Sequence, residues 1–190
     1  MAKKRLITEI GKYVLLQNLE YTDYTGTEPV EIGKIVDSFS KEDVMYIYYN
    51  KNNYKETGYH INIDVYVGDK GEFPVANTDD LHRACIYDQP DVFLAMMLHE
   101  YGHYKNGDLN RQDLTNKSIQ DDRLHCIRIG RVQDTERKAD AFAVRYVGKA
   151  AFLKSIDYMI LKRMQRNEDP SVTALAIREF ELRKRAVKNM

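Results

Sequence analysis

The sequence predicts an α+β fold in which a small antiparallel or mixed sheet packs on a helical core. Strand-like patterns gather in residues 41–78, whereas residues 79–190 carry apolar side chains at the spacing of helices. Strands and helices that are segregated along a chain, rather than alternating, are typical of α+β proteins. The length of 190 residues suits one domain with a single hydrophobic core. We therefore expect residues 1–190 to form one domain.

The N-terminal part, residues 1–40, is predicted to be helical. Within residues 3–20 the apolar side chains recur at helical spacing. They include Leu6, Ile10, Tyr13 and Val14. A shorter helix is expected over residues 28–40. These two helices would precede the β part of the domain.

Three strands are predicted within residues 41–78. Residues 44–49 are apolar and rich in tyrosine, and a turn-rich segment follows them. Residues 59–67 alternate apolar and polar side chains, as a half-buried antiparallel strand does. Residues 73–77 predict a short third strand. Because proline cannot donate a ladder hydrogen bond, Pro74 favours the edge of the sheet for this strand.

The rest of the chain predicts helices, and the first of them spans residues 90–106. Pro90 suits the first turn, and Gly107 suits the left-handed residue that ends a helix. This helix is apolar nearly all round, so we expect it to be buried. Residues 107–120 are expected to form a loop at the rim of a cleft. Later helices are predicted over residues 121–130, 134–147, 149–167 and 171–188.

The pattern H-E-x-x-H lies near the end of the predicted buried helix. It places His99 and His103 four residues apart, one turn apart on the same helix face. Two neutral imidazoles in this arrangement can bind one tetrahedral Zn²⁺. Glu100 follows the first histidine, where its carboxylate would face the open coordination position. Buried histidines and a buried glutamate are costly without partners, and a metal would supply the partner.

Catalytic zinc usually has three protein ligands, so a third ligand is expected elsewhere. A histidine six residues after His103 would indicate the metzincin pattern, but that position is Leu109. On the predicted helix 134–147, Glu136 and Asp140 share one face. Glu136 could bind the metal, and Asp140 could accept a hydrogen bond from a ligand histidine.

Two alternatives to this ligand set stay open. The two carboxylates could instead belong to a solvated helix face, paired with Arg137, Lys138 or Arg145. His125, which lies between the motif and Glu136, could be an alternative third ligand or a donor that faces an oxyanion. His60 and His82 are expected to be surface residues.

The pair H-E-Y-G-H and E-R-K-A-D-A-F-A resembles the gluzincin metallopeptidases, in particular the ImmA/IrrE-type peptidases and the minimal gluzincins. The resemblance covers about residues 75–148. It implies His99, His103 and Glu136 as zinc ligands and Glu100 as the general base. It also implies that Asp140 supports a ligand histidine within a gluzincin-type helical core. ImmA/IrrE-type proteins often carry a helix-turn-helix domain, and this sequence shows no clear one.

The resemblance also implies that an edge strand near the zinc binds an extended substrate. We expect this role for Val75, Ala76 and Asn77 of the predicted edge strand. The expected activity is zinc-dependent hydrolysis of peptide bonds in a narrow protein substrate. The alternative is a regulatory or interaction protein that holds zinc without general proteolytic turnover.

The composition bounds the partners of the chain. Its 29 basic and 29 acidic residues cancel, so net charge gives no general attraction to nucleic acid or membrane. The basic run Arg183-Lys184-Arg185 fits a helix end better than a nucleic-acid contact. Cys85 and Cys126 are too few for a disulfide scaffold or a cysteine-based zinc site, so free thiols are expected. With no membrane-spanning apolar stretch, we expect a cytoplasmic protein.

Overall fold

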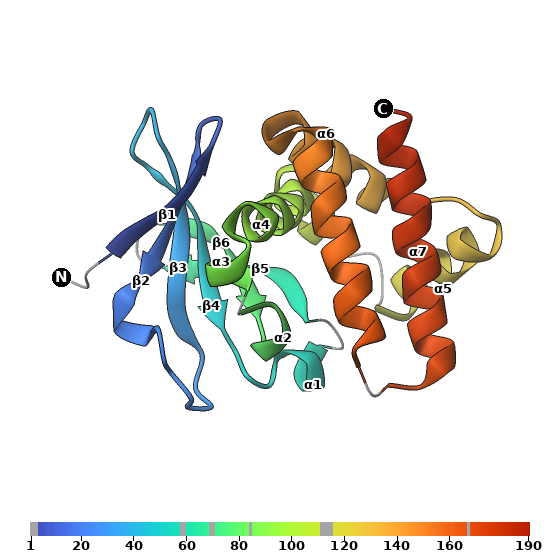
Figure 1. Cartoon of the computed structure of the whole chain (residues 1–190), viewed down its shortest axis with the longest axis horizontal. Coiled ribbons are helices and arrows are strands. Elements are labelled where there is room, and N and C mark those ends of the chain that lie inside the picture. The colour runs from blue at the N-terminus through green and yellow to red at the C-terminus, as the bar shows by residue number, and fades with distance from the viewer. Residues whose placement is uncertain (1–3, 58–59, 69–70, 84, 111–115, 167) are drawn as a thin grey trace.

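The computed structural model, which describes residues 4–57, 60–68, 71–83, 85–110, 116–166 and 168–190, pairs a mixed sheet with a group of helices (Figure 1). The sheet has six strands in the order β1-β2-β3-β4-β6-β5. Neighbouring strands are antiparallel, except for β4 and β6, which run parallel. The α+β class is therefore confirmed, with a mixed sheet. The strands are β1 Lys4–Ile10, β2 Tyr13–Asn18, β3 Val30–Asp37, β4 Asp43–Tyr49, β5 Ile61–Gly68 and β6 Gly71–Thr78.

The prediction of a helical part over residues 1–40 is wrong, because this segment forms β1, β2 and β3. β1 and β2 pair from Ile10 to Tyr13 around a two-residue loop that begins with Gly11, whose φ is +61°. Glycine at the first loop position is typical of tight hairpins. Five of the six β2 residues are buried. A strand covered on both faces shows no alternation, so its apolar residues also match a helical spacing.

The third predicted strand exists, but it is not at the edge. β6 lies between β4 and β5, and β5 is the last strand of the sheet. The parallel ladder with β4 involves only residues 75–78 of β6. Pro74 lies outside that ladder, so its missing N–H does not interrupt it. The edge expected for β6 belongs to β5.

The predicted helices are confirmed, with two differences. The helix predicted over residues 121–130 begins earlier, at Asn116, and η2 covers Asp108–Asn110, so the loop expected over residues 107–120 is wrong for these two parts. The predicted helices 134–147 and 149–167 form one element with a kink at Gly148, where φ is +79°. The first buried helix begins at Pro90 and ends before Gly107, whose φ is +73°. The α-helices are α1 Asn53–Thr57, α2 Asp80–Arg83, α3 Cys85–Asp88, α4 Pro90–Lys105, α5 Asn116–Arg128, α6 Asp134–Met164 and α7 Pro170–Lys188, and the 3-10 helices are η1 Leu19–Tyr21 and η2 Asp108–Asn110.

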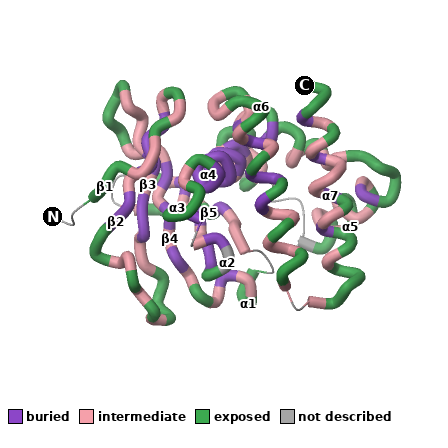
Figure 2. Tube along the Cα trace, viewed as in Figure 1, coloured by how far each residue is buried: buried purple, intermediate pink, exposed green. Residues whose placement is uncertain are grey.

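Helix α4 lies in the middle of the molecule, between the sheet and helices α6 and α7 (Figure 1). Residues 92–99 are all buried, so both sides of the helix contribute to the core (Figure 2). Gly102 lets α6 approach, because a Cβ added there would lie 3.0 Å from the Cα of Ala139. Ala139 and Ala143, small side chains of α6, are fully buried. This packing sets the last two turns of α4 directly against the first turns of α6.

Within the described residues, the structure has no helix of the length and apolar character needed to cross a membrane.

Candidate metal centre and its cleft

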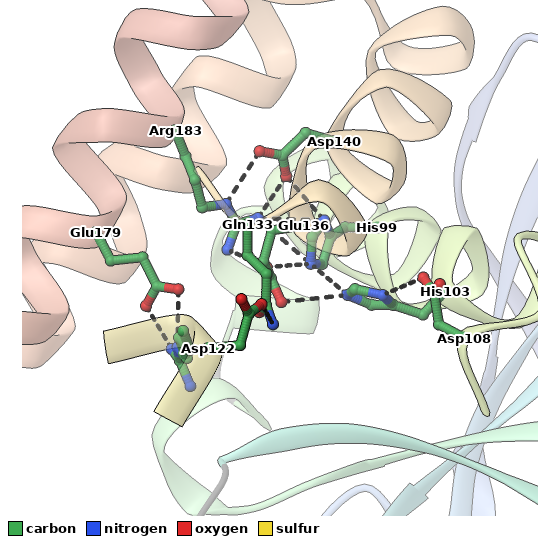
Figure 3. Close-up of polar contacts among 10 residues, drawn as sticks. His99, His103, Asp108, Asp122, Gln133, Glu136, Asp140, Glu179 and Arg183 are labelled. Atoms are coloured by element: carbon green, nitrogen blue, oxygen red, sulfur yellow. Dashed lines mark hydrogen bonds and ion pairs between the residues drawn. The ribbon is translucent and has the colours of Figure 1, made fainter. Parts of the chain in front are cut away.

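His99, His103 and Glu136 converge where α4 meets α6 (Figure 3). The two histidine Nε2 atoms are 3.2 Å apart. Glu136 places one oxygen 3.4 Å from Nε2 of His99 and the other 3.5 Å from Nε2 of His103. Ligands bound tetrahedrally to zinc at about 2.0–2.1 Å are separated by roughly 3.3–3.4 Å. The three side chains therefore fit a tetrahedral ion with one position left for another group.

The second nitrogen of each histidine has a carboxylate partner. Nδ1 of His99 lies 2.9 Å from Asp140 of α6, and Nδ1 of His103 lies 3.0 Å from Asp108. A carboxylate that accepts the Nδ1–H fixes the tautomer with a lone pair on Nε2, the atom that faces the centre of the cluster. Both imidazoles are therefore oriented as metal ligands.

Asp108 was not predicted from the sequence, whereas Asp140 was. Asp108 lies in η2, after α4 has ended at Lys105. The signal in the sequence was the helix stop around Gly107, whose left-handed backbone turns the chain back. A helix stop indicates that the chain changes direction after α4. It does not indicate which of the following side chains will contact His103.

Arg183 of α7 is the second residue that sequence reasoning missed. Its side chain is buried, with a residue exposure of 4%. The guanidinium binds both oxygens of Asp140, at 3.0 Å through Nε and 2.5 Å through Nη2, and it lies 3.1 Å from Glu136 through Nη1. A bidentate pair of this kind is strong and directional. Arg183 therefore links the candidate metal ligand to the carboxylate that supports His99.

A signal for Arg183 was present in the helical spacing of α7. The buried residues of this helix are Ala176, Glu179, Arg183 and Val187, which form one stripe. We had assigned Arg183 to a basic run at the helix end, but the run is divided in the structure. Lys184 pairs with Asp157, and Arg185 is exposed. An arginine on a buried stripe needs a buried anion.

The charges of the site depend on one another. Burial would raise the pKa of Glu136, but the nearby Arg183 and His99 outweigh it and hold this pKa well below its ordinary value. Burial and Arg183 oppose a charge on His99, yet hydrogen bonds to Asp140 and Glu136 raise its pKa to about 9. The carboxylates thus favour positive charge at the imidazole, which is the charge that a divalent cation would bring.

Glu100 lies on the same turn of α4 and lines the cleft beside the histidines. Its side chain is only partly accessible, and burial raises its pKa, with His99 and His103 acting in the opposite direction. A carboxylate with a raised pKa next to a metal position suits proton transfer.

The cluster opens into a cleft of about 930 Å³. One wall is the edge strand β5, with Ile61, Asn62 and Ile63, and the other is formed by residues of α5, α6 and α7. Val75, Ala76 and Asn77 are on the interior strand β6 and do not line the cleft, so the expectation that they form an edge strand beside the site is wrong. The edge strand in that position is β5. At the helical wall, Arg123 binds Glu179 through Nε at 2.8 Å.

His125 does not reach the candidate metal site. It is exposed on α5 and does not line the cleft. Leu124 and Ile127 of the same helix do line the cleft, and their apolar side chains turn the intervening histidine outward. The prediction that His125 is an alternative ligand or an oxyanion donor is therefore wrong.

The expectation for His60 and His82 was also wrong, while that for the cysteines is confirmed. His82 has an exposure of only 6%, and the His60 side chain has 15% and pairs with Asp79. Tyr158 of α6 packs on His82 with ring centroids 6.0 Å apart, and Glu168 lies 3.8 Å from Nε2 of His60. Cys85 and Cys126 are free thiols.

Comparisons of this chain with protein-family models, with curated proteins and with solved structures find no match.

Proposed function

We propose that this chain is a zinc-dependent metallopeptidase of the gluzincin type that hydrolyses peptide bonds in a narrow protein substrate. The observation that carries the proposal is the convergence of His99, His103 and Glu136: the two Nε2 atoms lie 3.2 Å apart, and each faces one oxygen of Glu136, at 3.4 and 3.5 Å, close to the edge of a tetrahedral zinc site. A purely structural zinc site would close its fourth position with a further cysteine or histidine. Of the described residues, only these three form a group suited to a metal ion.

Zn²⁺ bound here would supply a Lewis acid that acidifies water and polarises the scissile carbonyl. Glu100 would accept the proton of the attacking water on its carboxylate and deliver it to the leaving amine. Burial raises the pKa of Glu100, which makes its carboxylate a better proton acceptor than that of an exposed glutamate. The scissile C–N bond breaks, and the new C–O bond gives a carboxylate and an amine.

Arg183 would act as a positioning residue. It holds Asp140 with two hydrogen bonds, and Asp140 in turn holds His99 at 2.9 Å. The same guanidinium offsets the negative charge of Glu136 before a metal is bound. The orientation of one ligand and the ionisation of another therefore depend on a single side chain.

An extended substrate would lie along β5. This strand ends the sheet, so one side of its backbone has unpaired N–H and C=O groups, and its residues 61–63 line the cleft. A polypeptide added there as a further strand would pass the metal position. Backbone pairing gives affinity, while the cleft walls choose the side chains.

The first test is the Glu100→Gln variant, with Glu28→Gln as the matched control because Glu28 is exposed and far from the cleft lining. Metal analysis should give about one equivalent of zinc in all three proteins, as three ligands remain. Digestion of a mixed peptide library, followed by mass spectrometry, should show cleavage by the parent chain and by Glu28→Gln only. Loss of the general base should lower the rate by roughly 10²–10⁴-fold.

Two results would overturn the proposal. Full activity of Glu100→Gln would contradict the assigned base. A parent chain that holds zinc but cleaves no library peptide would instead favour the alternative, an interaction protein that keeps the metal without turnover.

A further inference from the structure

A second polar cluster lines the same cleft, away from the metal ligands. It comprises His60, His82, Arg163, Arg166 and Glu168, and we call it the arginine–histidine cluster. Four of its members line the cleft, and Glu168 joins them through ion pairs. Along α6, Phe152 packs on His99 with ring centroids 6.2 Å apart. Arg163 follows further along this helix, about 16 Å away at 1.5 Å per residue.

Most of the buried polar atoms that lack a hydrogen-bond partner lie in this cluster. Within the described residues, seven buried side-chain nitrogen or oxygen atoms have no hydrogen-bond partner. Five of the seven belong to this cluster: His60 Nε2, His82 Nδ1, Arg163 Nε, Arg166 Nε and Glu168 Oε2. The side chain of Arg166 is only 10% exposed and His82 only 6%. Buried polar groups are nearly always paired, so several unpaired groups in one place indicate a site for a ligand.

The geometry of the arginines leaves donors for a further anion. Arg163 and Arg166 both direct Nη1 to the same oxygen of Glu168, at 3.5 and 3.0 Å. Their Nε–H groups are buried and have no hydrogen-bond partner. The Nε edge of a guanidinium is suited to bidentate binding of a planar carboxylate.

The electrostatics of the cluster agree with this reading. Burial lowers the pKa of His82 to about 3, with added effects from His60, Arg166, Lys162 and Arg163. Burial and the charge of Arg163 also lower the pKa of Arg166, against the opposing effects of Glu168 and Asp79. Positive charge is therefore crowded at this end of the cleft, even with Glu168 and Asp79 beside it, and one added negative charge would relieve it.

We propose that the arginine–histidine cluster binds a carboxylate of the substrate. The inference rests on the proposed function, because it assumes that the cleft holds a polypeptide. A carboxylate fits better than a doubly charged anion, since Glu168 already offsets part of the positive charge. Glu168 Oε2, an acceptor, would match a backbone N–H of the same polypeptide.

The separation along α6 gives the place of this carboxylate in the substrate. Phe152 contacts His99, and the rise of about 16 Å from Phe152 to Arg163 corresponds to roughly five residues of an extended chain at 3.3 Å per residue. The substrate would therefore carry an acidic side chain, or its own C-terminal carboxylate, about five residues from the scissile bond. A charge requirement at that distance would make the substrate range narrow.

The test is a titration that needs no hydrolysis. Spectra of the ¹⁵N-labelled, zinc-loaded chain resolve arginine Nε–H signals, and those of Arg163 and Arg166 are assigned by their loss in Arg163→Lys and Arg166→Lys. N-acetyl-glutamate amide should shift both signals saturably, at least tenfold more tightly than N-acetyl-glutamine amide. N-acetyl-alanine tests the terminal carboxylate in the same way. Because carboxylates also bind zinc, the arginine signals are needed to locate the binding.

The titration distinguishes a carboxylate site at the arginine–histidine cluster from its absence. Saturable shifts with either carboxylate support the cluster, and the tighter probe identifies the source of the carboxylate. Absent shifts, or equal affinity for the glutamine probe, would overturn the inference. Arg178→Lys, an exposed position on α7, is the control and should leave the titration unchanged. If the chain cleaves no peptide but the signals still shift, the proposed peptidase fails and the carboxylate site stands.

Discussion

Arg183 carries most of the charge balance around the candidate metal ligands. Asp140 is fully buried and contacts Arg183 and His99. Glu136 also depends on this guanidinium for a pKa below its ordinary value. Removing the arginine would leave the buried carboxylate of Asp140 and the partly buried carboxylate of Glu136 without this cation. Breaking a buried pair in this way costs about 3–5 kcal/mol.

We therefore expect Arg183→Met to lower the free energy of unfolding by about 3–5 kcal/mol in the metal-free protein. Arg185→Met is the matched control, since Arg185 is exposed on the same helix and should change stability by less than about 0.5 kcal/mol. Urea unfolding in the presence of a chelator measures both. Equal stability of the two variants would show that the buried charges do not need Arg183.

Asp108 makes a narrower contribution, because it acts on a single ligand. It accepts from Nδ1 of His103 at 3.0 Å. Loss of such a support typically weakens metal binding by 10–100-fold. We expect Asp108→Asn to show this loss of zinc affinity in competition with a chelating dye. Asp121→Asn, at an exposed position of α5, should bind zinc as the parent does. Unchanged affinity in Asp108→Asn would assign Asp108 to the chain reversal alone.

The close approach of α4 and α6 brings the proposed metal ligands together. A Cβ at Gly102 would lie 3.0 Å from Cα and 3.1 Å from O of Ala139, both backbone atoms that cannot turn away. Gly102→Ala should therefore push the helices apart, with a loss of stability of about 1–3 kcal/mol. His103 lies on α4 and Glu136 lies on α6, so a larger separation of the two helices would move these proposed ligands apart. Zinc affinity should therefore fall as well.

Gly68→Ala is the control for Gly102→Ala. A Cβ at Gly68 would meet only the Tyr66 side chain, at 3.4 Å, which is ordinary contact. Thermal unfolding and zinc competition should both distinguish the two variants. A Gly102→Ala protein with the zinc affinity of the parent would show that the helices can separate without moving the ligands.

The elements that the sequence predicted correctly are those whose pattern is local. The i, i+4 spacing of His99 and His103 needs only a helix, and Pro90 and Gly107 indicate where that helix begins and ends. The N-terminal hairpin was missed because β2 is buried on both faces. Its sequence therefore lacks the alternation of apolar and polar residues that identifies a half-buried strand. Whether a strand lies at the edge depends on its partners, which is why the edge was predicted for β6 and belongs to β5.

The site was predictable to the same extent. Glu136 and Asp140 share one helix face by spacing alone, whereas Arg183 and Asp108 reach the site through the docking of α7 and the reversal after α4. His82 and Arg163 come from two helices, and His60 and Arg166 come from two separate loops, so their convergence is a property of the folded chain. Tertiary contacts of this kind leave only weak signals, such as a charged residue on a buried stripe.

At the scale of the whole molecule, the proposed metal ligands all come from α4 and α6, and the apolar core extends from the sheet through α4. The metal should therefore stabilise a fold that already exists without it. At a free zinc concentration 100 times the dissociation constant, binding adds about 2.7 kcal/mol. For a chain of this size each kcal/mol raises Tm by about 2–4 °C, so the expected rise is roughly 5–11 °C.

Calorimetry with a chelator, followed by return of zinc, would measure this shift, and circular dichroism should show that the metal-free chain keeps its helices. His99→Ala is the control, since without one ligand the Tm should no longer respond to zinc. A metal-free chain that is unfolded would mean that the core around α4 is not sufficient by itself. In that case the charges buried around Arg183, which a cation would offset, outweigh the apolar packing of the sheet and the helices.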